Sequence, residues 1–234
     1  MTPGDPVAGG LVGPGAALVD GAPVAEVTLE GRHVRLEPLR QHHLDPLIAA
    51  ATHPTETFRY TTVPADRAGM QRWLDEASAA AARGTALPFA TVDRRDGAVV
   101  GSTRFGNLDF WTWPDGVARR PARNPDGAEI GWTWLAPRSQ RTAINTEAKL
   151  LMLGHAFEQW RVWRVTLKTD ARNQRSRDAI ARLGCALDGV LRAWQLASDG
   201  GPRDTAIFSL LAGEWPAAKQ KLQERLHAGR TPSE

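Results

Sequence analysis

Apolar and polar residues alternate along several short stretches of the chain, and between these stretches apolar residues recur every three or four positions. The first pattern is typical of half-buried β-strands and the second of amphipathic α-helices. In chain order the two patterns predict one strand, two helices, three strands, a helix, a strand, a helix, two strands and a last helix. The predicted strands are 34–37, 88–92, 98–108, 129–135, 163–169, 187–196 and 203–211, and the predicted helices are 41–51, 65–82, one with an apolar face from 150 to 160, 173–183 and 214–227.

The same pattern divides the chain into three parts. Residues 1–25 are rich in Gly, Pro and Ala without periodicity, which predicts a flexible N-terminal tail. Residues 26–213 contain nearly all the predicted elements and form one expected domain, followed by a C-terminal helix and tail over 214–234. Inside the domain, residues 109–126 hold three prolines and fit no ordinary strand or helix. A long loop of this kind in a compact domain is usually functional or mobile.

The stretch from Glu129 to Glu158 joins a strand to a helix through a short polar break. Ile130, Trp132 and Trp134 alternate with smaller residues, and Ser139 to Thr146 then supplies small and polar residues before the helix. The start of a helix leaves backbone N–H groups unpaired beside the positive end of its dipole. Such a loop is a place to hold a phosphate, although the pattern alone also fits an ordinary strand–turn–helix.

The residue types in this loop resemble a family motif. The segment Gln140-Arg141-Thr142-Ala143-Ile144-Asn145, followed by Thr146-Glu147-Ala148, resembles the acetyl-coenzyme A motif of the GNAT N-acetyltransferases, in particular the RimJ/RimL-like branch that modifies ribosomal-protein N-termini. Ala143 and Asn145 depart from the glycine and the glycine or alanine that are usual there. Alanine remains compatible where the backbone is already helical, because only a positive φ demands glycine.

This resemblance covers about residues 27–211 and implies the GNAT acyltransferase fold. The fold is α+β with α/β-type layers: a central mixed, mostly antiparallel sheet of about seven strands flanked by helices. It implies acetyl-CoA as co-substrate, with the pantetheine arm on main-chain groups and the pyrophosphate on the loop. A second motif, Asn173 to Ser176, resembles the family's Asn-x-x-Ser. The implied coenzyme-binding residues are Trp134, Leu135, Ala136, Gln140, Arg141, Thr142, Ala143, Ile144, Asn145, Thr146 and Asn173.

Two residues are candidates for the chemistry of acetyl transfer. Transfer from a thioester to an amine needs a base for the amine and an acid for the departing thiolate. Glu129 opens the strand that leads into the loop and is the candidate base, acting directly or through water. The alternative is a structural ion pair with an insert arginine such as Arg119 or Arg123. Ser176 is the candidate acid; equally, Asn173 fits a helix N-cap with Ser176 three residues later.

The composition of the chain argues against several classes of protein. The chain has 234 residues, is 42% hydrophobic and carries a formal charge of +3, which is too small and too dispersed to suggest a nucleic-acid partner. No run of about 18 apolar residues suggests a membrane span. Cys185 is the single cysteine, which excludes an internal disulfide and fits a reducing compartment. The first basic residue is Arg32, so the start of the chain lacks the charged segment of a signal peptide. Both observations favour a cytoplasmic protein. The adjacent His42 and His43 lack further ligands at metal-site spacing, so no metal is expected.

The acceptor is less well defined than the donor. Its candidate surroundings are the loop 58–63, the insert and the closing hairpin with Arg192 and Trp194, where arginines and tryptophans suit a peptide, an acidic small molecule or a homodimer interface. The leading hypothesis is an acetyl-CoA-dependent N-acetyltransferase that modifies a protein N-terminus or a small primary amine. The alternatives are an acyltransferase that uses another donor such as succinyl-CoA, and a non-catalytic acyl-CoA-binding regulator.

Overall fold

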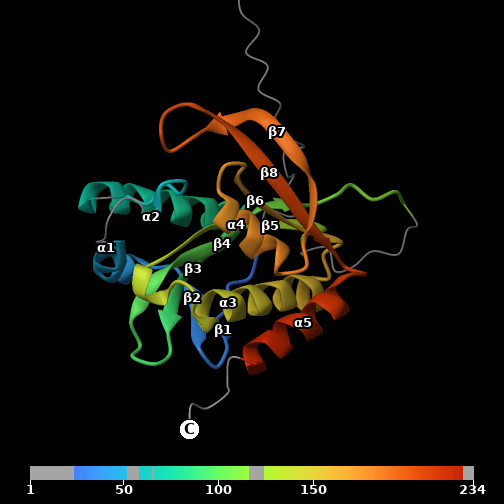
Figure 1. Ribbon diagram of the computed structural model, residues 1–234, viewed down its shortest axis with the longest axis horizontal. Helices are drawn as coiled ribbons and strands as arrows, with labels where there is room; N and C mark the ends of the chain where they lie inside the picture. The colour runs from blue at the N-terminus through green and yellow to red at the C-terminus, as the bar shows by residue number, and fades with distance from the viewer. Residues whose placement is uncertain (1–23, 52–57, 65, 116–123, 229–234) are drawn as a thin grey trace, which may run out of the picture.

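The computed structural model describes residues 24–51, 58–64, 66–115 and 124–228, which form one central sheet with helices packed on it (Figure 1). The strand order is β1-β2-β3-β4-β5-β6-β8-β7, and only β5 and β6 are parallel neighbours. The predicted sheet has about seven strands; the eighth is β1, whose two residues are too few to show alternation. The strands are β1 (Leu29–Glu30), β2 (Val34–Pro38), β3 (Leu87–Asp93), β4 (Val99–Asp109), β5 (Gly127–Leu135), β6 (Arg164–Asp170), β7 (Ala186–Leu196) and β8 (Pro202–Leu211).

The helices form where the sequence predicts them, with caps that explain their ends. Asp66 accepts a hydrogen bond from Gly69 N and caps α2, Asn173 caps α4, and Gly184 follows α4 with a φ of +93°. Figure 1 shows α3 and α5 side by side, while the β7–β8 hairpin extends away from them. The helices are α1 (Leu44–Ala51), α2 (Arg67–Ala82), α3 (Ala143–Gly154), α4 (Gln174–Ala181) and α5 (Trp215–Ala228), with 3-10 turns at Gln41–His43 and Pro137–Ser139 and a π-helical turn at His155–Trp160.

Two β-bulges interrupt the pairing of β4 with β5. In the first, the register shifts between Gly106 and Asp109, and Asn107 takes a φ of +44°. In the second, it shifts between Ser102 and Arg104, and Trp132 takes a φ of +50°. A bulge leaves one residue unpaired and turns its side chain in a new direction. The two bulges therefore set the directions of the side chains around Asn107 of β4 and Trp132 of β5.

A buried lysine from α3 fastens the second bulge. Lys149 Nζ donates hydrogen bonds to Thr103 Oγ1 at 2.8 Å and to Thr133 Oγ1 at 2.7 Å, and the two hydroxyls lie 2.8 Å apart. Lys149 is 4% exposed, and no carboxylate among the described residues forms an ion pair with it. Burial lowers the pKa of Lys149 to about 7. The bulge thus rests on an amine that titrates near neutral pH.

A buried carboxylate from α3 holds the first two strands. Glu147 accepts hydrogen bonds from the backbone N–H groups of Arg32 (2.9 Å), His33 (2.5 Å) and Val34 (2.9 Å). A Cβ on Gly31 would lie 2.4 Å from Glu147 Cδ, so the turn needs glycine for close approach. Glu147 therefore ties the β1–β2 turn to the helix that follows the polar loop.

Replacing Glu147 with glutamine is expected to destabilise the protein by about 2 kcal/mol, because one carboxylate oxygen becomes an NH2 group that faces a backbone donor. Urea unfolding measures this as a lower midpoint with an unchanged slope. Glu30→Gln, an exposed carboxylate on β1, is the matched control and should change stability by less than about 0.5 kcal/mol. Equal stability of the two variants would contradict the role given to Glu147.

The buried amine of Lys149 predicts a pH-dependent stability. Between its folded pKa of about 7 and its unfolded value of 10.5, the unfolded chain binds a proton that the folded chain does not. Stability from this residue therefore rises with pH across that window, by up to about 1.4 kcal/mol per pH unit. The difference in unfolding free energy between wild type and Lys149→Met should grow in favour of wild type from pH 7 to pH 9. A difference that is constant with pH would contradict this.

Candidate functional site

A cleft opens where β5 and β6 separate. The two strands pair only at Gly127, Ala128 and Glu129, opposite Arg164, Val165 and Thr166, and no pairing follows along Ile130–Leu135. The cleft has a volume of about 1230 Å³, more than a drug-sized ligand needs. Its walls come from β5 and β6, the loop before α3, the start of α4, residues 58–62 and the β7–β8 hairpin. The edge of β5 beyond Glu129 is therefore free on the side of β6.

The loop before α3 directs backbone N–H groups toward this cleft. Arg141 has a φ of +60°, and Thr142 caps the helix, with its Oγ1 accepting from Ile144 N at 3.3 Å and donating to Ser139 O at 2.8 Å. Within the described structure, the N–H groups of Arg141, Thr142 and Ala143 donate to no acceptor. They lie at the positive end of the α3 dipole, which is where an anion binds.

Gln140 connects the loop to both walls of the cleft. Its Nε2 donates to Leu135 O at 2.8 Å, and its Oε1 accepts from Arg175 of α4. Because one side chain touches β5 and α4 together, Gln140 sets the width of the cleft at the mouth of the loop. Arg141 and Arg175 add positive charge there, which suits a phosphate ligand.

Most of the coenzyme-binding residues expected from the sequence line the cleft, and two do not. Ile144 is 2% exposed and packs in the core, with its N–H capped by Thr142. Ala136 is also buried, with its N–H on Val100 O at 2.7 Å and its carbonyl accepting from Ser139 N at 2.9 Å, so its main-chain groups are already used. The residues at the cleft are Trp134, Leu135, Gln140, Arg141, Thr142, Ala143, Asn145, Thr146 and Asn173.

Glu129 lies at the last paired position of β5, where the cleft begins. Its Oε2 accepts from Asn107 Nδ2 at 2.7 Å and forms an ion pair with Lys168 Nζ at 2.7 Å. Its Oε1 receives no hydrogen bond from the described residues. A side chain at Gly131 would place Cβ 3.2 Å from Oε1, so glycine there leaves space at this oxygen. One carboxylate oxygen is thus anchored and the other is open.

The expected structural partner of Glu129 was an insert arginine. Arg119, Arg120 and Arg123 lie outside the described residues, and Lys168 of β6 is the cation that pairs with Glu129. The alternation of β6 had indicated only that Lys168 faces away from the apolar core. Which carboxylate it meets depends on the parallel register of β5 and β6, which the sequence does not encode locally.

Ser176 and Asn173 have the arrangement of a helix cap at the cleft wall. Asn173 Oδ1 accepts from Ser176 N at 3.0 Å, as the capping interpretation predicts. Both residues line the cleft and are partly exposed. The Ser176 hydroxyl has no protein partner among the described residues and is available to a ligand.

Two segments far apart in sequence meet at the outer rim of the cleft. Ser198 Oγ donates to Arg59 O at 2.5 Å, and the Arg172 guanidinium lies 5.4 Å from the centre of the Tyr60 ring. Tyr60 is distant in sequence from Glu129 and Ser176, but its loop lines the cleft with them. The closing hairpin reaches the cleft through Gln195, Leu196, Ser198 and Arg203 rather than through Arg192 or Trp194.

The root of the 109–126 insert is held by an acid–tryptophan contact away from the cleft. Asp126 accepts hydrogen bonds from Trp111 N at 2.8 Å and from Trp113 Nε1 at 3.1 Å. None of the insert residues that the structure describes, 110–115 and 124–126, lines the cleft. The rest of the insert, 116–123, lies outside the described residues.

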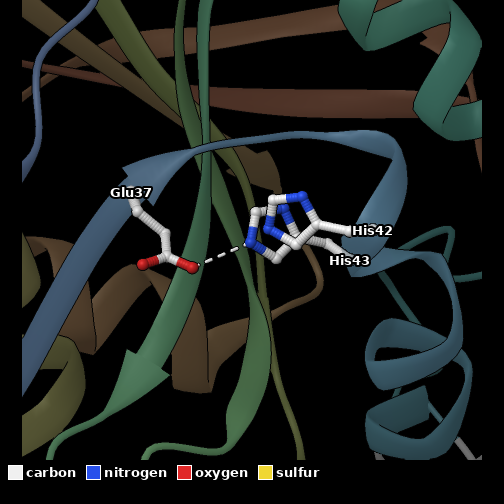
Figure 2. Close-up of side chains that lie close together, drawn as sticks. All are labelled: Glu37, His42 and His43. Carbon is white, nitrogen blue, oxygen red and sulfur yellow. Dashed lines mark hydrogen bonds and ion pairs between the residues drawn. The ribbon is translucent and has the colours of Figure 1, made fainter.

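Glu37, His42 and His43 lie close enough together to resemble a metal site (Figure 2). His43 Nδ1 accepts from Arg40 N at 2.9 Å, so its Nε2 carries the proton that bonds to Glu37 Oε1 at 2.8 Å. Glu37 also pairs with Arg35. A metal-binding histidine needs a free lone pair, and His43 has none. Through these bonds His43 joins the turn before α1 to Glu37 of β2.

Two further observations concern other classes of function. Burial raises the pKa of the Cys185 thiol to about 12, which argues for packing rather than nucleophilic chemistry. In the part of the chain that the structure describes, every helix is too short or too polar to cross a lipid bilayer.

Comparison with known proteins identifies the family of this site. Residues 33–186 match the model of the acetyltransferase (GNAT) domain. A GCN5-related N-acetyltransferase from Brucella melitensis is 33% identical, with a TM-score of 0.76 and 89% of each chain covered. A probable GNAT-family acetyltransferase from Chromobacterium violaceum is 25% identical, with a TM-score of 0.67, covering 92% of this chain and 100% of that one.

A third structure shares the fold at lower identity. RimJ from Mycobacterium smegmatis, solved in complex with CoA-disulfide, is 24% identical, with a TM-score of 0.68 over 89% of this chain and 97% of that one. No curated protein sequence matches the chain. Because the domain match spans more than half of the sequence, this chain belongs to the GNAT acetyltransferase family.

Proposed function

We propose that this protein transfers an acetyl group from acetyl-CoA to a primary amine, on a protein N-terminus or a small molecule, with Glu129 as the general base. The observation that supports the proposal is the position of Glu129: it lines the cleft where β5 and β6 separate, with Oε2 anchored and Oε1 without a hydrogen bond from the described residues. A base needs a free lone pair within reach of the proton it removes.

The donor half of the cleft suits acetyl-CoA. The free N–H groups of Arg141, Thr142 and Ala143 and the guanidinium groups of Arg141 and Arg175 favour the pyrophosphate. The unpaired edge of β5 beyond Glu129 offers main-chain groups to the amide-bearing pantetheine arm. The bound thioester would supply the acyl group, while the protein holds and orients it.

In the proposed reaction, Glu129 Oε1 accepts a proton from the acceptor amine, directly or through one water, as the amine nitrogen forms a bond to the acetyl carbon. The carbon–sulfur bond then breaks, and the thiolate takes a proton. The hydroxyl of Ser176 is the proposed donor, because it lies in the cleft without a protein acceptor. No covalent intermediate on the protein is needed, in agreement with the inert Cys185.

A negative charge at the start of α3 is expected to weaken coenzyme binding. Ala143→Asp places a carboxylate among the proposed pyrophosphate ligands and should raise the dissociation constant for acetyl-CoA by about tenfold or more. Ala143→Asn has nearly the same shape without the charge and should bind within about threefold of wild type. Isothermal titration measures both. Equal binding by the two variants, or no binding by wild type, would exclude this loop as the coenzyme site.

Replacing the proposed base is expected to affect turnover rather than coenzyme binding. Glu129→Gln should lower kcat/KM for the acceptor by about 100-fold or more, with the acetyl-CoA dissociation constant unchanged. Lys168→Met is the matched control, since it also removes the ion pair but keeps the carboxylate, and its loss should be at least about tenfold smaller. A similar loss in both variants would assign the effect to the ion pair instead.

A further inference from the structure

The cleft is strongly unbalanced in charge. Glu129 is the only carboxylate among the described residues that line it, and it is already paired with Lys168. The lining cations fall into two groups. One comes from the loop before α3, from α4 and the residue after it, and from α5, and it contains Arg141, Arg175, Arg182 and Arg225. The other lies near Glu129 and the hairpin and contains Arg59, Lys168 and Arg203. The remaining lining amine, Lys149, is bound to Thr103 and Thr133.

Arg203 shares a sheet face with the proposed base. On β6, Val165 and Leu167 point into the apolar core, so Lys168 and Asp170 point to the other face. Asp170 lies opposite Thr205 of β8, so the two side chains share a face. Arg203 precedes Thr205 by two residues and therefore lies on that face as well. Lys168 contacts Glu129 on this face. Arg203 and Glu129 therefore approach the cleft from the same side of the sheet.

Arg203 is a cation without a carboxylate partner in the described structure. Its Nε is buried and donates no hydrogen bond, and the Thr205 hydroxyl beside it is equally unsatisfied. The nearby carboxylates are occupied: Asp170 binds Arg172 at 2.8 Å, and Glu129 binds Lys168. Burial lowers the pKa of Arg203 despite the attraction of these two carboxylates. A buried donor such as Arg203 Nε is costly to leave without an acceptor, and a bound ligand can supply one.

A second unsatisfied donor lines the same cleft. Trp134 is 4% exposed, yet its Nε1 has no acceptor among the described residues. Its ring meets Phe58 and Trp73 edge-on, with centroids 6.1 and 6.4 Å away. The two buried polar atoms of the cleft lining that lack partners, Arg203 Nε and Trp134 Nε1, are thus both donors. Such a cleft is suited to a ligand that brings acceptor oxygens.

We propose that the acceptor substrate carries an anionic group, a carboxylate or a phosphate, besides its amine, and that Arg203 binds this group. The proposal rests on the acetyl transfer proposed above and specifies the class of its acceptor. The pyrophosphate of the coenzyme is assigned to the free N–H groups of α3 with Arg141 and Arg175, whereas Arg203 lies on the sheet face that carries Lys168 and Glu129. The planar guanidinium matches two oxygens of one anion.

The test compares acceptors that differ in one group only. The first series is 5-aminopentanol, 5-aminopentanoate and 5-aminopentyl phosphate; the second is Ala-Gln-Phe-amide, Ala-Glu-Phe-amide and Ala-phosphoserine-Phe-amide. Wild type should use one anionic member of a series at least about tenfold better in kcat/KM than the neutral member, as expected for a charge-assisted hydrogen bond. The preferred member tells carboxylate from phosphate.

The variants separate this site from the donor site. Arg203→Met should bring the ratio of anionic to neutral turnover close to one while leaving the neutral acceptor within about threefold, and Arg203→Lys should retain part of the ratio. Arg175→Met should raise KM for acetyl-CoA and leave the ratio unchanged.

The outcomes are distinguishable from failure of acetyl transfer itself. Equal use of neutral and anionic acceptors by wild type, or a ratio that survives Arg203→Met, would overturn the inference while acetyl transfer stands. Binding of acetyl-CoA without turnover of any amine would instead overturn the proposed function. If Arg203→Met does not fold, inhibition of the wild-type protein provides the test instead. Pentanoate or pentyl phosphate should compete with the acceptor, and pentanol should not.

Discussion

The separation of β5 from β6 is the constraint on which the rest of the site depends. Two parallel strands that pair over only three residues would normally leave backbone donors and acceptors without partners. Here each of the two strands is hydrogen-bonded to another strand on its opposite edge. β4 pairs with β5 as far as Leu135, and β8 pairs with every residue of β6. The opening is therefore held by the sheet itself, and the free edge of β5 can receive an extended ligand without any strand having to move.

Charge is concentrated at the point where the strands part. Glu129 is only 9% exposed, and it is compensated by Lys168 from the far arm and Asn107 from a bulge of β4. A buried carboxylate without such partners would be costly. The bulge is necessary because the alternation of a regular strand would fix the face on which the Asn107 side chain lies. The left-handed backbone of Asn107 instead turns its amide toward Glu129. Irregularity in β4 thus positions the group that orients the proposed base.

Local signals in the sequence account for most of the fold and for part of the site. The alternation around Ile130 and Trp134 predicts strand β5 correctly, because it acts within a few residues, but it wrongly gives Trp132 the same buried face: Trp132 is 42% exposed at the bulge. The cap at Asp66 and the glycine at 184 also act within a few residues and are predicted correctly. The Lys168–Glu129 ion pair, the bulges and the approach of Tyr60 arise from register between distant strands, which no short window contains. Lys149 could be predicted only in part. A charged residue between Ala148 and Met152 on a buried helix face can be recognised in the sequence as unusual, but its threonine partners are 16 and 46 residues away.

The departures from the glycine pattern of the family motif also have a physical explanation. Glycine is favoured where φ is positive, and in this loop the positive φ falls on Arg141, before the helix begins. Ala143 and Asn145 already lie within α3, where their backbones are helical and a Cβ is tolerated. What the loop needs is a helix start whose N–H groups are fixed in direction. Glu147 and Lys149 fix this start by tying the first two turns of α3 to the β1–β2 turn and to the β5 bulge. The direction of the N–H groups therefore depends on the sheet more than on the residue types of the motif.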